Sequence, residues 1–240
     1  MAALLVLATS DVAHAYRPFD STDASVVDEG ILEIEVQPVG WLREGRSDAL
    51  VTPAIVANLG VEPRWEIVVQ GRNVVALDGT AAAEETELVD TGAFLKGVLR
   101  HGSLQGATGP SIATELGVLL PTSNDSSGVG ATAVAIVSQR WPLATVHVNL
   151  APIWSRDDHL ELFIGAIGEG PAHWVVRPVA EMFVEKQIGG ELVVSGLAGA
   201  IWRVTDELSF DLAFRRAGES GTSVDELRAG FTWEFRVYSS

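Results

Sequence analysis

Polar and apolar residues alternate at every second position along most of this chain, and this period of two constrains the fold more than any other feature. Between 146 and 150, for example, His147 and Asn149 alternate with Val146, Val148 and Leu150. Successive side chains of a strand point to opposite faces, so such a segment has one polar face and one apolar face. The alternation recurs in about twelve segments. Almost nowhere do polar residues recur at the spacing of a helix. The sequence therefore predicts an all-β chain.

All but the last of the predicted strands are longer than the usual five or six residues. They cover 31–41, 49–59, 65–74, 87–99, 111–120, 131–140, 145–153, 159–167, 175–185, 191–203, 208–215 and 231–236. Most have roughly the 9 to 11 residues that a tilted strand needs to cross the hydrocarbon layer of a membrane. No run of 18 apolar residues is present, which excludes a transmembrane helix. Any membrane span must therefore consist of strands.

The connections between these segments alternate in character. Short turns are expected at 60–64, 141–143 and 204–207, and longer polar loops at 78–85, 122–130, 155–158 and 217–225. Short periplasmic turns and longer outer loops are typical of an up-and-down barrel, although the connection at 100–110 is long for its periplasmic side. We predict that residues 31–240 form one transmembrane antiparallel up-and-down β-barrel of about twelve strands.

The number of strands decides which face of the barrel is polar. About eight strands give an interior that side chains can fill, whereas twelve strands with their apolar faces inward would leave a void. We therefore expect the polar faces to point into the lumen and the apolar faces to contact lipid. The tryptophans agree, because aromatic girdles lie at strand ends in membrane barrels. All of them are at or near predicted strand ends: Trp41, Trp65, Trp141, Trp154, Trp174, Trp202 and Trp233.

The polar faces define a set of predicted lumen-lining residues, in which arginines and one histidine are interleaved with carboxylates. The set is Glu33, Glu35, Glu66, Arg72, Glu115, His147, Asn149, Glu161, Arg177, Glu181, Asp211 and Arg215. Opposed charges either line a narrow pore or close it with ion pairs. Two roles stay open: a passive channel for small solutes, hydrophobic ones included, or a plugged structural barrel without transport.

The first residues predict export. Residues 1–15 have a short apolar core and end in Ala13-His14-Ala15, a small-x-small cleavage pattern, so we interpret them as a signal peptide. We expect the true start of this signal peptide to lie further upstream, because the segment lacks a positively charged region. Residues 16–30 are expected to lead into the first strand from the periplasm. The expected location is the outer membrane of a Gram-negative bacterium, with outer-membrane lipid as a partner.

Composition excludes several classes of function. The formal net charge of −16 argues against nucleic acid as a partner, because nucleic-acid binding needs a basic surface. The chain has no cysteine, so thiolate nucleophiles, disulfides and cysteine metal sites are absent. No phosphate loop, serine elbow or zinc motif is present either. We expect no cofactor and no resident metal, although His159 near Asp157 and Asp158 is a candidate site for a divalent cation in an outer loop.

An enzyme is the third alternative. His147 and Asn149 share the predicted lumen face, and Ser138 lies on the neighbouring strand, which suggests a barrel-wall hydrolase with a histidine base. Spacing alone does not bring a nucleophile and its base together, so the main expectation is a protein without catalytic activity.

Several short motifs resemble one family of bacterial outer-membrane proteins, the MetA-pathway of phenol degradation family. They are Arg17-Pro18-Phe19, 20–24, Glu29-Gly30, 32–35, 109–111, 121–122, 146–150 and 230–235. This resemblance implies an outer-membrane barrel of a kind commonly labelled as a transporter, with a small-molecule solute and no assigned catalytic residues. It also implies the barrel assembly machinery as a partner, although here Phe235 is not the terminal residue.

Overall fold

The computed structural model describes residues 17–77, 86–123, 128–190, 192–219 and 222–238. The predicted signal peptide, residues 1–15, lies outside them. No helix among the described residues is long and apolar enough to span a bilayer.

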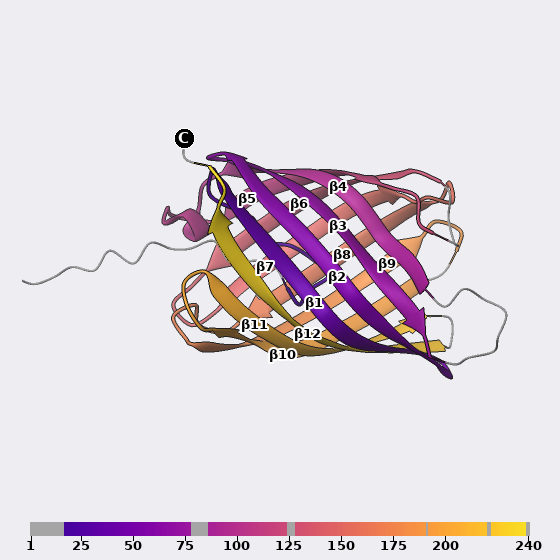
Figure 1. Ribbon diagram of the computed structural model, residues 1–240. Helices are drawn as coiled ribbons and strands as arrows, with labels where there is room; N and C mark the ends of the chain where they lie inside the picture. Colours follow the sequence, from indigo (N-terminus) through magenta and orange to yellow (C-terminus); the bar gives the residue numbers. More distant parts are fainter. Residues whose placement is uncertain (1–16, 78–85, 124–127, 191, 220–221, 239–240) are drawn as a thin grey trace, which may run out of the picture.

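Twelve strands and one short 3-10 helix, η1, form the fold (Figure 1). The strands are β1 (Ile31–Glu44), β2 (Ser47–Glu62), β3 (Trp65–Ala76), β4 (Thr86–Arg100), β5 (Ser111–Leu119), β6 (Gly130–Arg140), β7 (Thr145–Trp154), β8 (Leu160–Glu169), β9 (Val176–Gln187), β10 (Leu192–Arg203), β11 (Leu208–Glu219) and β12 (Thr222–Arg236). Each pairs antiparallel with its neighbours in sequence, and β1 pairs with β12 to close the ring. The predicted all-β, twelve-stranded antiparallel barrel is confirmed.

The strands alternate between buried polar and exposed apolar side chains. In β9, Arg177 and Glu181 are buried inside the barrel, whereas Val176 and Met182 are exposed on its outside. The alternation has the opposite sense to that of a soluble protein, in which apolar side chains face the interior. The period of two in the sequence therefore separates a polar interior from an apolar exterior.

The residues just before β1 and just after β12 meet where the barrel closes. Gly30 precedes β1 with a φ of 79°, a left-handed conformation that favours glycine. Its N–H donates to the carbonyl oxygen of Gly60 at 2.9 Å, and its own carbonyl oxygen accepts from the Val237 N–H at 2.8 Å. The Tyr238 hydroxyl donates to the same Gly60 oxygen at 2.8 Å. We call this side of the barrel, where β1 begins and β12 ends, the terminal end.

One predicted loop is wrong. Residues 217–225 were expected to form a long polar loop, but β11 continues to Glu219 and β12 begins at Thr222. Ala217 pairs with Val224 and Gly218 with Ser223, so these small and polar residues extend the hairpin beyond its apolar part. The connection predicted to be long at 100–110 contains η1 (Ser103–Gln105), and its Leu104 is buried. Length and polarity of a segment therefore do not separate a loop from the polar end of a strand.

Candidate functional site

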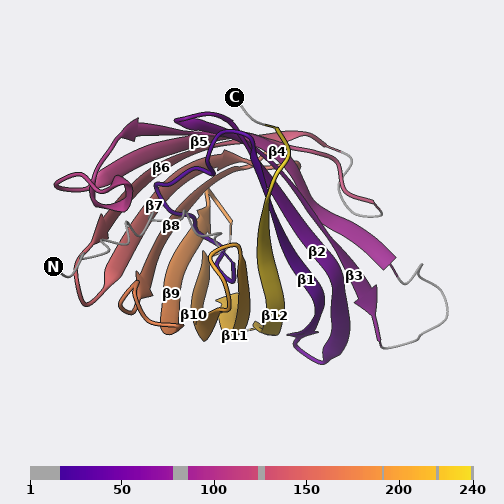
Figure 2. The same cartoon turned by 60° about the vertical axis from the view of Figure 1, so that its left-hand side comes forward.

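The N-terminal segment, residues 17–30, runs through the inside of the barrel (Figure 2). The structure thus places this segment inside the barrel, and the expectation that it enters from the periplasmic side stays a prediction. Its residues contact β1, β3, β4, β6, β7, β9, β11 and β12 from within. Buried charges and backbone groups need partners, and the polar interior supplies them. We call residues 17–28 the plug.

The plug begins with two charged residues that bind opposite charges of the last strands. Arg17 donates from Nε to Asp211 at 3.1 Å and from Nη2 to Gln37 at 3.1 Å. Asp20 accepts from Arg228 at 2.9 Å and lies 3.3 Å from Arg215. Burial raises the pKa of Asp20, but the Arg228 and Arg215 guanidinium groups outweigh it and hold this pKa below its usual value. Asp20 is therefore a charged anchor.

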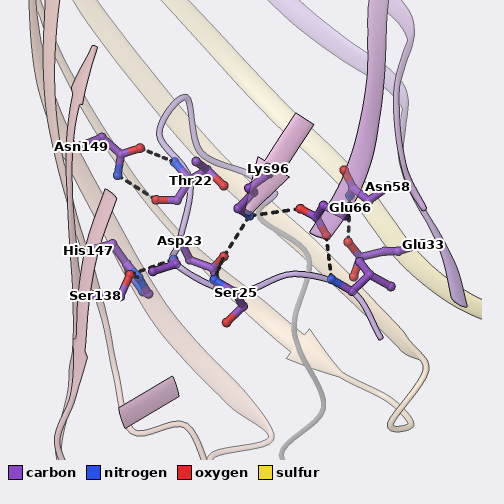
Figure 3. A network of polar contacts seen from close by, with 12 residues as sticks. Thr22, Asp23, Ser25, Glu33, Asn58, Glu66, Lys96, Ser138, His147 and Asn149 are labelled. Carbon is purple, nitrogen blue, oxygen red and sulfur yellow. Dashed lines mark hydrogen bonds and ion pairs between the residues drawn. The ribbon is translucent and has the colours of Figure 1, made fainter. Parts of the chain in front are cut away.

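The next residues of the plug are held through their backbone. Glu181 accepts from the N–H groups of Asp20 at 2.9 Å and Ser21 at 2.7 Å. The Asn149 amide accepts from the Thr22 N–H at 3.0 Å and donates to the Thr22 carbonyl oxygen at 2.7 Å, as a neighbouring strand would (Figure 3). These bonds satisfy backbone groups that would otherwise be buried without partners. These hydrogen bonds depend on the backbone path of the plug more than on the identity of its side chains.

A lysine links the middle of the plug to the wall. Lys96 Nζ lies 3.2 Å from Asp23 and 3.3 Å from Glu66, and the Lys96 and Glu66 side chains are less than a tenth exposed (Figure 3). Glu66 also accepts from the Val27 N–H at 2.6 Å. Near this link, Ala24 packs in a small apolar cluster with Leu104. A charge bridge and a hydrophobic contact therefore fix the same stretch of plug.

A serine, a histidine and a glutamate form a buried relay at the terminal end. Ser138 Oγ lies 2.7 Å from His147 Nδ1, and His147 Nε2 lies 3.1 Å from Glu169, which pairs with Arg177 at 2.6 Å. Ser138 Oγ also accepts from the Ala24 N–H at 2.9 Å, and the serine is fully buried. A nucleophile needs access to its substrate, and the plug covers this hydroxyl. The serine of the relay therefore anchors the plug.

Two cavities remain beside the plug. The larger, of about 760 Å³, is lined by residues of β1 to β11 and reaches the end of the barrel opposite the terminal end, where Arg156 and Glu161 line it. The smaller, of about 360 Å³, lies at the terminal end and is lined by His101, Arg140 and His147 among others. The plug residues Asp23, Ser25 and Val26 line both cavities, so the plug separates them.

Each predicted lumen-lining residue lies on the inward face of its strand. Glu33, Glu35, Glu66, Arg72, Glu115, Asn149, Glu161 and Arg215 line the larger cavity, and His147 and Arg177 line the smaller one. Glu181 and Asp211 bind the plug. The structure thus brings the set together around the plug, and a role of these residues in transport stays a prediction.

Several inward-facing residues of the site are missing from the predicted set. They are Gln37, Asn58, Lys96, Ser138, Glu169, Glu226 and Arg228. Glu226 and Arg228 lie in β12 before its predicted start at 231, and Glu169 lies beyond the predicted strand 159–167. Extending the period of two beyond the predicted strand ends would have found these three, and the same alternation inside the predicted strands points to the other four.

No cluster of three or more histidine and acidic side chains in the described parts of the chain is arranged to hold a metal ion. His159 is instead placed by its backbone, whose N–H donates to Ser155 Oγ at 3.1 Å.

Comparison with known proteins gives the fold but no family. No family model matches the chain, so the resemblance to the MetA-pathway of phenol degradation family stays a prediction. No curated protein matches it either.

Solved structures of similar fold include an outer membrane channel and a porin. An outer membrane channel from Pseudomonas putida F1 is 9% identical, with a TM-score of 0.63 over 90% of this chain and 100% of that one. The KdgM porin in complex with disordered oligogalacturonate is 10% identical, with a TM-score of 0.56 over 85% of this chain and 99% of that one. At these identities the likeness shows a shared fold.

Proposed function

We propose that this protein is an outer-membrane channel that passes small solutes by diffusion, hydrophobic ones included, through a lumen narrowed by its own N-terminal plug. The observation that carries the proposal is the orientation of the side chains: charged side chains point into the barrel, and large apolar side chains point outward. Leu150, Ile164, Met182 and Leu212 are between 45% and 68% exposed on four different strands. A soluble monomer rarely exposes so much contiguous apolar surface. A lipid bilayer would cover it.

The tryptophans support the same placement. Trp65, Trp202 and Trp233 lie near the terminal end of the barrel. Trp41 and Trp154 lie near its opposite end. Trp154, Trp202 and Trp233 are about half exposed. Tryptophan is enriched at both membrane interfaces, because its ring is apolar and its N–H needs a polar partner. Two levels of exposed tryptophan mark the edges of a membrane-crossing band.

The cavities favour a channel over a barrel wall enzyme. A space of about 760 Å³ inside a barrel can admit a small molecule. In contrast, Ser138 is buried beneath Ala24, so the hydroxyl that a hydrolase would use as its nucleophile is covered by the plug. The channels and porins of similar fold support this reading.

The plug supports a second role, that of a closed structural barrel. Glu181, Asn149 and Lys96 hold the plug at three successive points, and the plug separates the two cavities. If the plug never leaves, the barrel has no continuous wide passage. Conductance measurements separate this role from that of a channel.

The test uses the full chain refolded in detergent, together with a variant that lacks residues 17–26. Mobility on gels before and after boiling first shows that each barrel is folded. Single-channel conductance in planar bilayers is then recorded for both. We expect small steps for the full chain and steps several-fold larger for the deletion variant, because the plug fills the lumen. Silence of both barrels would support the structural role and reject the channel.

A further inference from the structure

The part of the lumen that the plug leaves free is lined by more carboxylates than cations. Among the described residues that line the larger cavity, Glu33, Glu35, Glu115 and Glu161 make no ion pair. They come from β1, β5 and β8, so they face the cavity from different parts of the wall. The negative charge of this space is therefore spread along its length.

The cations that line the same cavity are already bound. Lys96 pairs with Asp23 and Glu66, and Arg215 pairs with Asp20 and Glu226. Arg72 lies 2.6 Å from Asp90. Arg156 donates to two backbone carbonyl oxygens, at 2.6 and 2.7 Å. Lys96 also lies opposite Glu115 in register and offsets part of the charge there. Among the described residues, however, ten carboxylates and only four lysine and arginine side chains line the cavity, so a mobile cation would meet an acidic surface.

Glu33 gives the independent sign that the space takes a ligand. Its side chain is only 2% exposed, and its Oε2 has no hydrogen-bond partner among the described residues. Its Oε1 accepts from the Asn58 amide at 2.8 Å (Figure 3). The same amide also donates to Glu35 at 2.8 Å. Across the barrel seam, Glu33 pairs in register with Glu234, another carboxylate. A buried carboxylate oxygen without a donor is costly, and a bound cation would satisfy it.

We propose that the channel selects cations, and that Glu33, Glu35 and Glu115 set this selectivity inside the lumen, with Glu161 at its far mouth. The inference rests on the proposed channel function and names its solute class: inorganic cations and small solutes that carry an amine or guanidinium group. Rings of acidic side chains select cations in other pores, because they raise the local cation concentration and lower that of anions.

The test measures the reversal potential of the full chain in planar bilayers under a KCl gradient. The lumen variant is Glu33→Gln, Glu35→Gln and Glu115→Gln together. The control is Glu44→Gln, Glu62→Gln and Asp206→Asn, which removes the same charge from exposed positions at the barrel ends. In water, one carboxylate about 8 Å from the ion path changes the local cation concentration by about twofold. We therefore expect the ratio of potassium to chloride permeability to fall by roughly two- to tenfold in the lumen variant and to stay unchanged in the control.

The outcomes separate this inference from the proposed function. Conductance without cation preference, or a preference that the lumen variant keeps, would overturn the inference and leave the channel intact. A silent wild-type barrel would overturn both. If the triple variant fails to show heat-modifiable mobility, Glu115→Gln alone serves, because Glu115 makes no ion pair among the described residues. A fall of about twofold in the permeability ratio of this single variant supports the inference, and an unchanged ratio rejects it.

Discussion

Replacing Lys96 by methionine should release the plug. In the closed barrel this lysine is the cation between Asp23 of the plug and Glu66 of the wall. Removing one member of a buried ion pair costs about 3 to 5 kcal/mol, because the other charge is left uncompensated. When the plug leaves, Asp23 returns to water and Glu66 can be hydrated, so most of this cost falls on the docked state. At about 1.4 kcal/mol per tenfold, docking should weaken by about 10²- to 10³-fold.

The absence of cysteine provides the assay. In a Ser21→Cys background the chain has a single thiol, at a position that is 6% exposed when the plug is docked. A maleimide then reacts only when the plug opens, and in the regime of fast reclosing its rate follows the open population. We expect the labelling rate to rise by about 10²-fold or more in Lys96→Met.

Two further variants keep this reasoning falsifiable. Lys186 is the only other lysine of the chain and is exposed, so Lys186→Met should leave the labelling rate unchanged. Adding Asp23→Asn and Glu66→Gln to Lys96→Met removes the uncompensated charges and should restore much of the protection. A Lys96→Met barrel that labels within about threefold of its parent would refute the idea that this charge bridge holds the plug.

Three other predictions follow from the wall and the relay. Leu150→Arg places a charge on the lipid face of β7 and should cost about 2 to 4 kcal/mol of unfolding free energy, measured by denaturant titration in lipid vesicles. Gly60→Ala puts a Cβ 2.1 Å from the carbonyl oxygen of Asp28 and should increase labelling of the Ser21→Cys plug, whereas Gly196→Ala, with nothing within 4 Å, should not. The wild-type barrel should hydrolyse no lipid ester; activity that His147→Ala abolishes would assign an enzyme to the relay.

The strands were predictable because alternation is a local property. His147 and Asn149 face inward and Val148 and Leu150 outward, as the period of two requires. The inversion of the faces was also predictable, since twelve strands with an apolar interior would leave a void. The ends of the strands were harder to predict from the sequence. Residues 222–230 combine small, polar and charged residues, and the pairing with β11 and β1 makes them a strand.

The plug could not be predicted from the sequence. Residues 17–30 are rich in serine, threonine and aspartate, a composition equally suited to a solvated linker. Their place is decided by acceptors and charges far along the chain, such as Glu181 for the Ser21 N–H and Arg228 for the Pro18 carbonyl oxygen. No local signal contains this information. The relay of Ser138, His147 and Glu169 depends likewise on strand register, which brings Ser138 opposite His147.

The contacts of the plug constrain the order in which the molecule folds. Arg228 lies 210 positions after Pro18, and Asp211 lies 194 positions after Arg17. These contacts cannot form until the last two strands have been made and have joined the sheet, and contacts at such separation are slow to form. The middle of the plug contacts β3, β4, β6, β7 and β9, so these bonds do not depend on the last two strands. The first residues of the plug precede every strand in the chain, yet they can reach their final positions only after β12 has been made.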